Sequence, residues 1–570
     1  MRWNIGEKIL GYYEILKVHE GGMGIVYVVW DHRWKMYSAI KTLKDEIFWD
    51  DEAIKRFRKE ADTWVNLEKH TNIVFAIITI IIDGKPHILL EYIEGGNLAQ
   101  LVGKLNIFEL FDFAIQFCDG MDYAYSKLGI IHRDIKPGNI LISKCNNKRI
   151  YKTTDFGLVA ILEDAYQEKK LKILSEQVSH GIGTWPYMPP EQFPGKFLNR
   201  YSFNPKPITT RSDIYSFGVT LYEVSTGRRP FSNLDEIFKT DPVNPKLINQ
   251  TIPYQLDKLI MRCLEKNPDE RPRNFKELRD ELIEMHRNIF TDDYIIIGKK
   301  EELDEVDWLN KGFSYGQLEQ FEDALRCFDI MLTKNGQNAK ALSGKGTSLL
   351  MLNRVEEALV YIDQALKIEP NDNIILNAKA ACLIKANRYE DALEYLDKGL
   401  QRPFDQLNYL LERVPLLTNK SVCLLRLGKY QPALDCINEA LRLYPRSTEC
   451  LINIGIILSD LGRFNDAIES FEKVISMDPK NADAWLQRGY ASHLLGSQDK
   501  NMFRFENAIK SFDKVLEINH TGAEAWIGKG IALYVLDKDK EAKKCFENAL
   551  SFSRDEEIVE TARKYLEKIR

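Results

Sequence analysis

Residues 132–139 of this chain read His132-Arg133-Asp134-Ile135-Lys136-Pro137-Gly138-Asn139, and Thr154-Asp155-Phe156-Gly157 follows a short distance later. Together they bring two carboxylates and one amide into a small part of the sequence. Carboxylate and amide oxygens are ligands that suit Mg²⁺. Transfer of a phosphoryl group depends on divalent metal ions and on the position of the attacking hydroxyl. The two motifs therefore predict an enzyme that moves a phosphoryl group.

The same two motifs, in this order, resemble those of the eukaryotic-like protein kinase family. Single short motifs often match by chance, but ordered sets rarely do. The resemblance implies an α+β bilobal protein-kinase fold that uses ATP and Mg²⁺. It assigns Asp155 and Asn139 to the metal ion, Asp134 to the substrate hydroxyl and its proton, and Lys136 to the γ-phosphate.

A glycine-rich segment, residues 18–27, lies upstream between two apolar stretches typical of strands. Glycine allows the backbone to approach phosphate oxygens closely, and the resemblance implies a β-hairpin that covers the phosphates of ATP. The implied contacts are Val18, Gly21, Gly22 and Gly24. His19 stands where the family usually has its first loop glycine, which leaves the effect on ATP affinity open.

Ala39-Ile40-Lys41 follows on the next strand-like stretch and matches the family signature around its phosphate-binding lysine. The resemblance implies that Lys41 holds the α- and β-phosphates and pairs with a glutamate on the following helix. Glu60 is the preferred partner because it follows the basic run 56–59, as the family's glutamate does. Glu52 is the competing choice.

The apolar run 87–96 reads as a buried strand that ends in a glycine-containing connector. It resembles the segment that joins the two lobes of a kinase and contacts adenine. The implied adenine-binding set is Val26, Ala39, Leu90, Glu91 and Ile93, with Leu90 in the gatekeeper place.

Several residues resemble the family's substrate platform and activation segment. Lys136 lies two residues after Asp134, as in serine/threonine kinases rather than tyrosine kinases. The implied structural roles are Thr184 as a bridge to that lysine and aspartate, Glu191 paired with Arg271, Asp213 bonded to the catalytic-loop backbone, and Arg133 as a dock for a phosphate placed between residues 158 and 185. The platform favours a protein substrate over a small molecule, which is the weaker alternative.

After about Arg287 the chain becomes a series of helical segments in which alanines recur every 34 residues, with two spacings of 41. The column consists of Ala324, Ala358, Ala392, Ala433, Ala467, Ala508 and Ala542. This period resembles the tetratricopeptide repeat, in which stacked helical pairs share one core and leave a concave groove. We expect a multidomain protein with a kinase domain over 12–286, a linker over 287–304, seven repeats over 305–556 and a capping helix over 557–570.

The resemblance implies that this all-α solenoid binds a peptide or protein and recruits partners or substrates. An architectural or autoinhibitory role is left open. A reading from a different class is a repeat scaffold joined to a nucleotide-binding pseudokinase-like switch domain.

Composition excludes some other classes of protein. A net charge of −6, from 78 basic and 84 acidic residues, argues against a general nucleic-acid surface. Nine cysteines without a C-x-x-C pair favour reduced thiols and a cytoplasmic protein. The isoleucine-rich run 77–82 is too short to span a bilayer, and the first residues lack the apolar core of a signal peptide. We expect neither nucleic acid nor a membrane as a partner.

Overall fold

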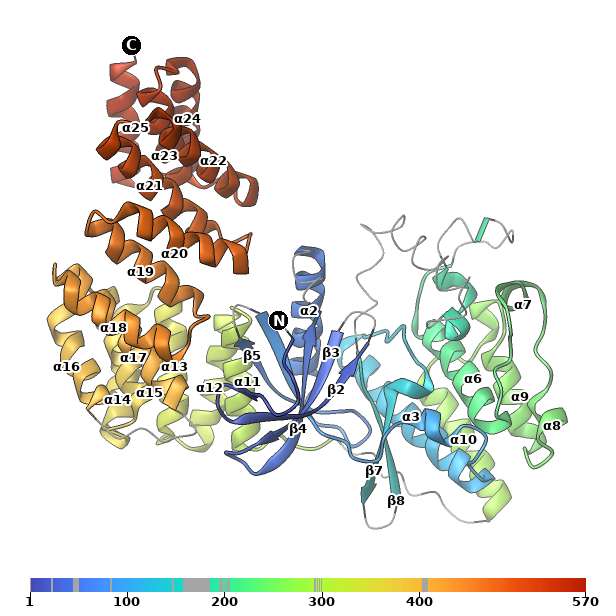
Figure 1. Ribbon diagram of the computed structural model, residues 1–570. Helices are drawn as coiled ribbons and strands as arrows, with labels where there is room; N and C mark the ends of the chain where they lie inside the picture. The colour runs from blue at the N-terminus through green and yellow to red at the C-terminus, as the bar shows by residue number, and fades with distance from the viewer. Residues whose placement is uncertain are drawn as a thin grey trace.

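The computed structural model describes residues 2–21, 24–44, 51–82, 85–145, 148–156, 185–193, 198–199, 201, 206–291, 294, 296, 298, 300–401 and 409–569. Figure 1 shows three consecutive parts: a lobe with a β-sheet, a helical lobe, and an array of helical hairpins. The sheet-containing lobe lies between the other two, which places it in contact with both.

Among the described residues, the first lobe contains a six-stranded antiparallel sheet with the strand order β1-β2-β3-β4-β6-β5. Its strands are β1 (Lys8–Ile9), β2 (Tyr13–Glu20), β3 (Gly24–Asp31), β4 (Met36–Leu43), β5 (Ala76–Ile82) and β6 (Lys85–Glu91). Successive side chains of a strand point to opposite faces of the sheet. Ile40 therefore joins an apolar cluster on one face, whereas Ala39 joins the cluster that includes helix α2 (Asp51–Leu67) on the other.

The second lobe is built around the long helices α3 (Ile107–Leu128), α6 (Thr210–Thr226) and α10 (Phe275–Phe290). Its shorter elements are η1 (Leu98–Leu101), η2 (Pro137–Asn139), β7 (Ile140–Cys145), β8 (Lys148–Thr153), η3 (Trp185–Tyr187), η4 (Pro190–Gln192), α7 (Leu234–Lys239), α8 (Pro245–Ile248), α9 (Tyr254–Cys263) and η5 (Pro268–Glu270). Asn106 caps α3 in a reciprocal arrangement with Glu109, and Gly129 ends it with φ 64°. Phe117 and Phe217 stack at 4.6 Å and tie α3 to α6.

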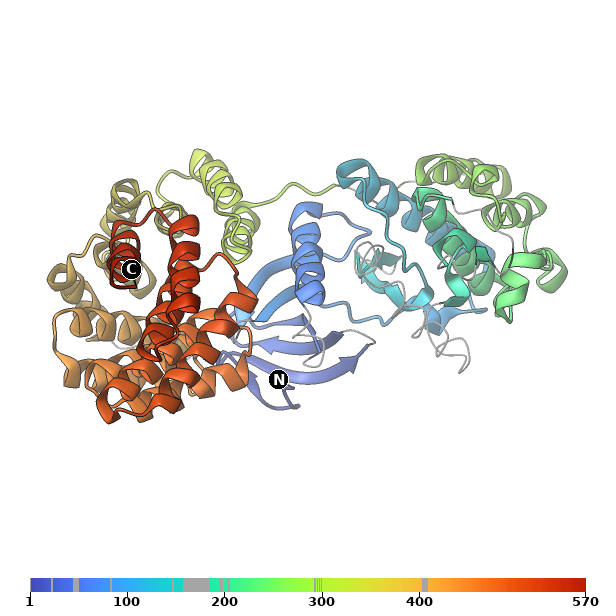
Figure 2. The same ribbon diagram turned by 90° about the horizontal axis from the view of Figure 1, so that it is seen from above.

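The third part is a run of antiparallel helix pairs followed by one further helix. The bounds are α11 (Glu305–Gln317), α12 (Phe321–Lys334), α13 (Ala339–Met351), α14 (Val355–Ile368), α15 (Asn373–Lys385), α16 (Tyr389–Leu400), α17 (Tyr409–Arg426), α18 (Tyr430–Leu443), α19 (Thr448–Asp460), α20 (Phe464–Met477), α21 (Ala482–Asp499), α22 (Met502–Ile518), α23 (Ala523–Val535), α24 (Asp539–Phe552) and α25 (Glu556–Lys568). Figure 2 shows the pairs following a curved path beside the sheet-containing lobe.

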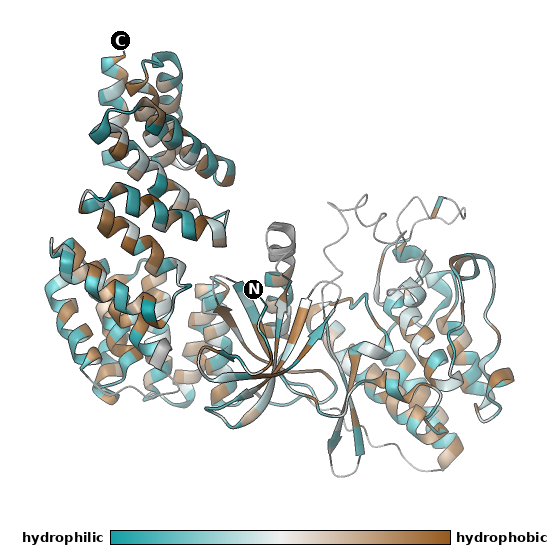
Figure 3. Cartoon of the chain, in the orientation of Figure 1, coloured by the Kyte–Doolittle hydropathy of each residue, from teal (hydrophilic) through white to brown (hydrophobic). Residues whose placement is uncertain are grey.

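The columns of small residues explain how the helix pairs approach one another. All seven alanines of the 34-residue column are 0% exposed. A Cβ placed on Gly312 would lie 2.6 Å from the ring of Phe328, so glycine is needed at that closest approach. Figure 3 shows apolar and polar residues alternating along these helices, as expected where one face of each helix is buried.

The two 41-residue spacings in the alanine column fall in different parts of the array. Residues 402–408, in the longer spacing between Ala392 and Ala433, lie outside the described residues. The second longer spacing, between Ala467 and Ala508, does not contain a long loop. Its extra residues extend α21 to 18 residues and α22 to 17, against 13 and 14 in the neighbouring pair α19 and α20. Only Lys500 and Asn501 lie between α21 and α22, and Lys500 has a left-handed φ of 53°.

Helix α11 lies against the sheet-containing lobe. The backbone N–H of Thr79 in β5 donates to Ser314 Oγ at 3.0 Å, and Lys69 Nζ lies 2.6 Å from Asp307 Oδ2. The array is thus fastened to the first lobe by its first helix. Within the part of the chain that the structure describes, no helix has both the length and the apolar character to cross a bilayer.

Candidate active site

The site is centred on the ammonium of Lys41 in β4. Its Nζ lies 2.5 Å from Glu60 Oε1 and 2.7 Å from Asp155 Oδ1. The side chains of Lys41 and Glu60 are 5% and 0% exposed, and that of Asp155 is 30% exposed. Strand alternation turns Lys41 toward α2, because Ile40 occupies the opposite face. The structure therefore brings three of the predicted site residues together from β4, α2 and the segment after β8.

Burial and charge act in opposite directions on this group. Burial disfavours the ammonium of Lys41, but Asp155 and Glu60 outweigh that effect and raise its pKa. Burial would raise the pKa of Asp155, but the charge of Lys41 lowers it instead. For Glu60, which is fully enclosed, burial prevails and raises the pKa. Lys41 and Asp155 are therefore both charged at neutral pH.

Trp64 is a member of the site that the sequence reasoning missed. Its indole Nε1 donates to Glu60 Oε1 at 3.3 Å, and its ring meets that of Phe156 edge to face at 5.5 Å. Trp64 lies four residues after Glu60, on the same face of α2. That spacing is the signal from which it could have been found.

The loop after α3 holds a second group of predicted residues. Lys136 Nζ lies 2.8 Å from Asp134 Oδ2. Asn139 Nδ2 donates to the same carboxylate oxygen and to the backbone carbonyl of Asp134, each at 2.9 Å. Oδ1 of Asp134 accepts no hydrogen bond from the described residues, and the side chain is 21% exposed. This oxygen is therefore available to a hydroxyl that enters the site.

Backbone contacts connect this loop to Asp155. The N–H of Thr154 donates to the carbonyl of Asn139 at 3.0 Å. His132 Nε2 lies 2.9 Å from the carbonyl of Thr154, and its ring contacts Phe156. Asn139 and Asp155 therefore come from two segments that are directly bonded.

The oxygens of this pair suit a hard divalent cation. Asn139 uses Nδ2 for its hydrogen bonds, which leaves Oδ1 as a donor atom to a metal, and Asp155 uses only Oδ1 toward Lys41. Nowhere in the described ranges do three or more His, Cys, Asp or Glu residues form a group that could hold a metal. An ion held by one amide and one carboxylate would take its remaining ligands from bound phosphates and water.

Asp213 binds the backbone of the loop that contains Asp134. It is 1% exposed, and its two carboxylate oxygens accept the N–H groups of His132 at 2.6 Å and Arg133 at 2.7 Å. Burial raises the pKa of Asp213 to about 6. Arg133 has a left-handed φ of 66°, a conformation that a non-glycine residue keeps only when its surroundings enforce it.

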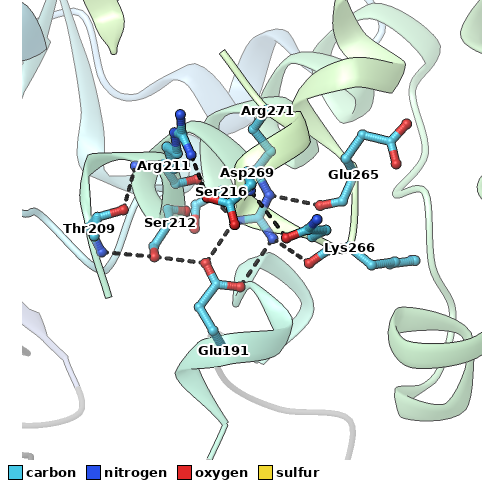
Figure 4. Close-up of polar contacts among 10 residues, drawn as sticks. Glu191, Thr209, Arg211, Ser212, Ser216, Glu265, Lys266, Asp269 and Arg271 are labelled. Atoms are coloured by element: carbon cyan, nitrogen blue, oxygen red, sulfur yellow. Dashed lines mark hydrogen bonds and ion pairs between the residues drawn. The ribbon is translucent and has the colours of Figure 1, made fainter. Parts of the chain in front are cut away.

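A buried ion pair braces the second lobe beneath the site (Figure 4). Arg271 Nη1 and Nη2 lie 2.7 and 3.0 Å from the two oxygens of Glu191, and both side chains are 0% exposed. Ser212 Oγ donates to the same carboxylate at 2.7 Å, and Arg271 also donates to the carbonyls of Arg211, Glu265 and Lys266. Ser212, adjacent to Asp213, was not predicted.

Most of the residues expected to contact nucleotide lie on the sheet that also carries Lys41. Val18 is on β2, Gly24 and Val26 are on β3, and Ala39 in β4 is directly opposite Leu90 in β6. A Cβ on Gly24 would lie 2.8 Å from the carbonyl of Thr42, so glycine is required there by the strands themselves.

The remaining expected residues are placed as follows. Gly21 donates its N–H to Gly24 at 2.9 Å, Ile93 is 8% exposed, and the Glu91 side chain lies 2.7 Å from Lys152. Gly22, Thr184 and the predicted phosphorylation segment lie outside the described residues, and nothing is described of the Glu52 side chain.

Comparison with known proteins agrees with this geometry. The family model described as the protein kinase domain matches residues 12–283. Tetratricopeptide repeat models match residues 309–373, 349–414, 414–447 and 455–496. The predicted fold class, a bilobal kinase fold followed by an all-α repeat solenoid, is confirmed.

Curated relatives match about half of the chain. A probable serine/threonine-protein kinase of Clostridium acetobutylicum is 32% identical over 300 residues, 51% of this chain and 42% of that protein. Serine/threonine-protein kinase PknB of Mycolicibacterium smegmatis is 31% identical over 302 residues, 50% of this chain and 43% of that protein. The chain thus spans less than half the length of these relatives. A crystal structure of the PknI kinase domain of Mycobacterium tuberculosis aligns with 21% identity and a TM-score of 0.36, over 50% of this chain and 99% of that one.

Proposed function

We propose, for a chain that consists of a protein kinase domain followed by tetratricopeptide repeats, that it is an ATP-dependent serine/threonine protein kinase. The reaction converts ATP and a protein hydroxyl into ADP and a phosphoprotein. The observation that carries the proposal is the convergence of Lys41, Glu60 and Asp155 beside the group formed by Asp134, Lys136 and Asn139. The names of the relatives favour serine and threonine as acceptors.

Each group has a task that follows from its contacts. The ammonium of Lys41, held by Glu60, binds the α- and β-phosphates. Oδ1 of Asp134 accepts a hydrogen bond from the substrate hydroxyl and then its proton, while Oδ2 remains bonded to Lys136 and Asn139. Lys136, which reaches over the same carboxylate, binds the γ-phosphate.

Mg²⁺ fits the oxygens of Asn139 and Asp155, and when bound it would offset the negative charge of the phosphates. Nucleotide enters under the hairpin of β2 and β3. Val18, Gly21, Gly22 and Gly24 cover the phosphates, and Val26, Ala39, Leu90 and Ile93 contact adenine together with the backbone of Glu91. Arg133, Asp213, Glu191 and Arg271 support the loop and the platform.

Transfer of radiolabelled phosphate from ATP to a generic protein substrate tests the proposal. Asp134→Asn and Asp155→Asn each remove one carboxylate from the site, and we expect incorporation to fall by about 10²–10⁴-fold. Asp539→Asn, the same change at the start of α24 in the array, should leave incorporation unchanged. Equal incorporation in the wild type and both site variants would disprove the assignment. Nucleotide binding by the wild type without transfer would indicate a switch domain instead.

We propose that the repeat array recruits a protein partner or substrate. Large apolar side chains on first helices of its repeats remain exposed, among them Ile374 at 58% and Met351 at 59%. Stacked repeats form extended concave surfaces of the kind that bind other proteins. The test is to capture binding proteins with the Asp134→Asn full-length chain and ask whether wild type phosphorylates them more than it phosphorylates proteins that were not captured. No preference would remove the recruiting role.

A further inference from the structure

The junctions between consecutive repeats share one kind of ion pair. A lysine or arginine in the first helix of a repeat meets an acid in the second helix of the preceding repeat. Within the described part of the array, the pairs are Lys345–Asp329 at 2.5 Å, Lys379–Asp363 at 2.6 Å, Lys420–Asp397 at 2.6 Å, Arg488–Glu472 at 2.8 Å and Lys529–Asp513 at 2.6 Å. The cations follow the 34-residue period and its longer spacings, so the pairing is a property of the repeat.

The first repeat has a cation in the same column although no repeat precedes it. Lys311 lies 34 residues before Lys345. Its Nζ lies 3.7 Å from Oε1 of Glu68, the residue that directly follows α2 in the kinase domain. Glu68 thus supplies the carboxylate that a preceding repeat would supply. It is also bonded to Lys127 and Lys300, at 3.2 and 3.1 Å.

This junction is more buried than those within the array. The side chains of Lys311 and Glu68 are both 12% exposed. The acids of the other junctions are 43–55% exposed. A charge that is buried is destabilising when its partner is removed, so losing one charge should matter more at this contact between the domains than at an exposed repeat junction.

Hydrogen bonds between uncharged groups also connect α11 to β5 and α2. We call this set of contacts between α11 and the kinase domain the joint. Ser314 Oγ accepts the backbone N–H of Thr79 in β5 at 3.0 Å. Tyr315, which is 6% exposed, donates its hydroxyl to Asn66 Oδ1 at 2.7 Å. Asn66 in turn donates to the carbonyl and carboxylate of Asp62, one turn earlier in α2.

Helix α2 therefore makes contacts on two faces, one toward the kinase core and one toward the array. Glu60 and Trp64 point into the kinase core, where Glu60 binds Lys41. On the other face, Asn66 and Arg58 contact the array, Arg58 at 3.8 Å from Glu319, and Glu68 contacts it just after the helix ends. A movement of α11 away from the lobe would release the outer face of α2, and the helix that carries Glu60 would lose this support.

We infer that α11 is a positioning element of the kinase site. Through Lys311, Ser314 and Tyr315 it holds α2 and β5 from outside, and α2 then holds Glu60 within hydrogen-bond distance of Lys41. These residues do not touch nucleotide, so they are positioning residues. The inference rests on the proposed kinase function for its meaning, but its structural core, the coupling of α11 to α2, can be measured without phosphoryl transfer.

Two full-length variants with matched controls test it. Lys311→Met removes the charge at the joint, and Lys529→Met removes the charge of the same column between the last two repeats. Tyr315→Phe removes the hydroxyl bonded to Asn66, and Tyr490→Phe removes one that donates to the carbonyl of Glu524 at 3.2 Å within the array. Steady-state kinetics gives kcat and KM for ATP, and amide hydrogen exchange reports the opening of residues 57–67.

We expect each joint variant to raise KM for ATP or lower kcat by about three- to tenfold, equivalent to 0.7–1.4 kcal/mol. Amides of residues 57–67 should exchange faster in these two variants. Both array controls should match the wild type in kinetics and in exchange over 57–67. Thermal unfolding checks that all four chains are folded, and Tyr315→Phe, which deletes a single oxygen, keeps the test valid if Lys311→Met is not.

Wild-type kinetics together with unchanged exchange over 57–67 in Tyr315→Phe and Lys311→Met would overturn the inference. Failure of the proposed function has a different signature, namely no transfer by the wild type. In that case ATP affinity and hydrogen exchange still decide the matter: weaker affinity and faster exchange in the joint variants alone support the coupling, and equal values in all chains refute it.

Discussion

Trp64 connects the two carboxylates that surround Lys41. Its indole N–H donates to Glu60, and its ring packs at an interplanar angle of 89° against Phe156, the neighbour of Asp155. The side chain is 2% exposed. One residue therefore contacts both Glu60 and the segment that carries Asp155.

Replacing Trp64 separates these two roles. Trp64→Phe keeps a ring against Phe156 and removes the N–H, and loss of one hydrogen bond to a charged group, about 1–2 kcal/mol, should lower kcat/KM for ATP by roughly five- to thirtyfold. Trp64→Leu removes the ring as well and should lower it further. Kinetics of both purified variants measures the difference. Equal losses in the two variants would mean that the hydrogen bond, and not ring packing, positions Glu60.

His87 makes the first lobe sensitive to acid. It is 2% exposed, and burial lowers its pKa to about 4, although its Nδ1 contacts the carbonyl of Lys85 at 2.7 Å. An unfolded histidine titrates near 6.5. Between these values the unfolded chain binds more protons, so the free energy of unfolding falls as pH decreases from 6.5 toward 4.

The contribution of His87 can be isolated by substitution. Between pH 6.5 and pH 5 the protonation of His87 should lower the free energy of unfolding by about 1.6 kcal/mol, and His87→Gln should remove that part of the pH dependence. His70, whose pKa burial also lowers to about 4, remains in both chains as an internal reference. Urea denaturation at the two pH values is the measurement. An identical slope in wild type and variant would show that His87 titrates normally.

At the scale of elements, the pair formed by Glu191 and Arg271 joins η4 to the segment before α10. Both side chains are 0% exposed, and Ser212 at the start of α6 adds a third contact. Charges removed from water in this way are stable only while they remain paired. Separating η4 from the segment before α10 would therefore leave a buried charge without its partner.

Breaking the pair should be more harmful than removing it. Glu191→Gln leaves the guanidinium of Arg271 buried without a counter-charge and should lower the free energy of unfolding by about 3–5 kcal/mol. The double variant Glu191→Met with Arg271→Met should lose less than the sum of the single changes. Chemical denaturation of Glu191→Met, Arg271→Met and the double variant gives the coupling energy. Additive losses would mean that the two side chains act independently.

Sequence reasoning succeeded where a short segment determines its own neighbours. Asp134, Lys136 and Asn139 lie within one loop and bond to one another, so their proximity followed from the motif. The pairing of Lys41 with Glu60 depends on how α2 crosses the sheet, which is why Glu52 could compete as a candidate. The contact between Lys311 and Glu68 could not be predicted in this way. The period predicts which repeats touch, but no spacing rule relates residue 311 to residue 68.

At the scale of the whole molecule, the kinase domain and the array share a buried boundary. Helix α11 covers β5 and the end of α2, so removal of the array would expose apolar and polar groups that are now enclosed. Val65, which is 9% exposed, lies at this boundary together with Phe75 and Ala76. The stability of the kinase domain thus includes a contribution from residues beyond 300.

A truncation series measures that contribution. A chain that ends at residue 290 should melt roughly 5 °C below the kinase transition of the full chain, the shift expected for a loss of about 2 kcal/mol in a domain of this size. A chain that ends at residue 338 retains α11 and α12 and should recover most of the difference. Calorimetry of the three chains provides the comparison. Equal melting temperatures for the 290 and 338 chains would show that the first repeat does not stabilise the domain.

The column of ion pairs along the array has one position without charge. Ile454 in α19 and Asn438 in α18 take the places of the cation and the acid. Salt screens exposed ionic contacts but leaves apolar packing intact. High ionic strength should therefore weaken the junctions that contain an ion pair, whereas the junction between the fourth and fifth repeats should be unaffected.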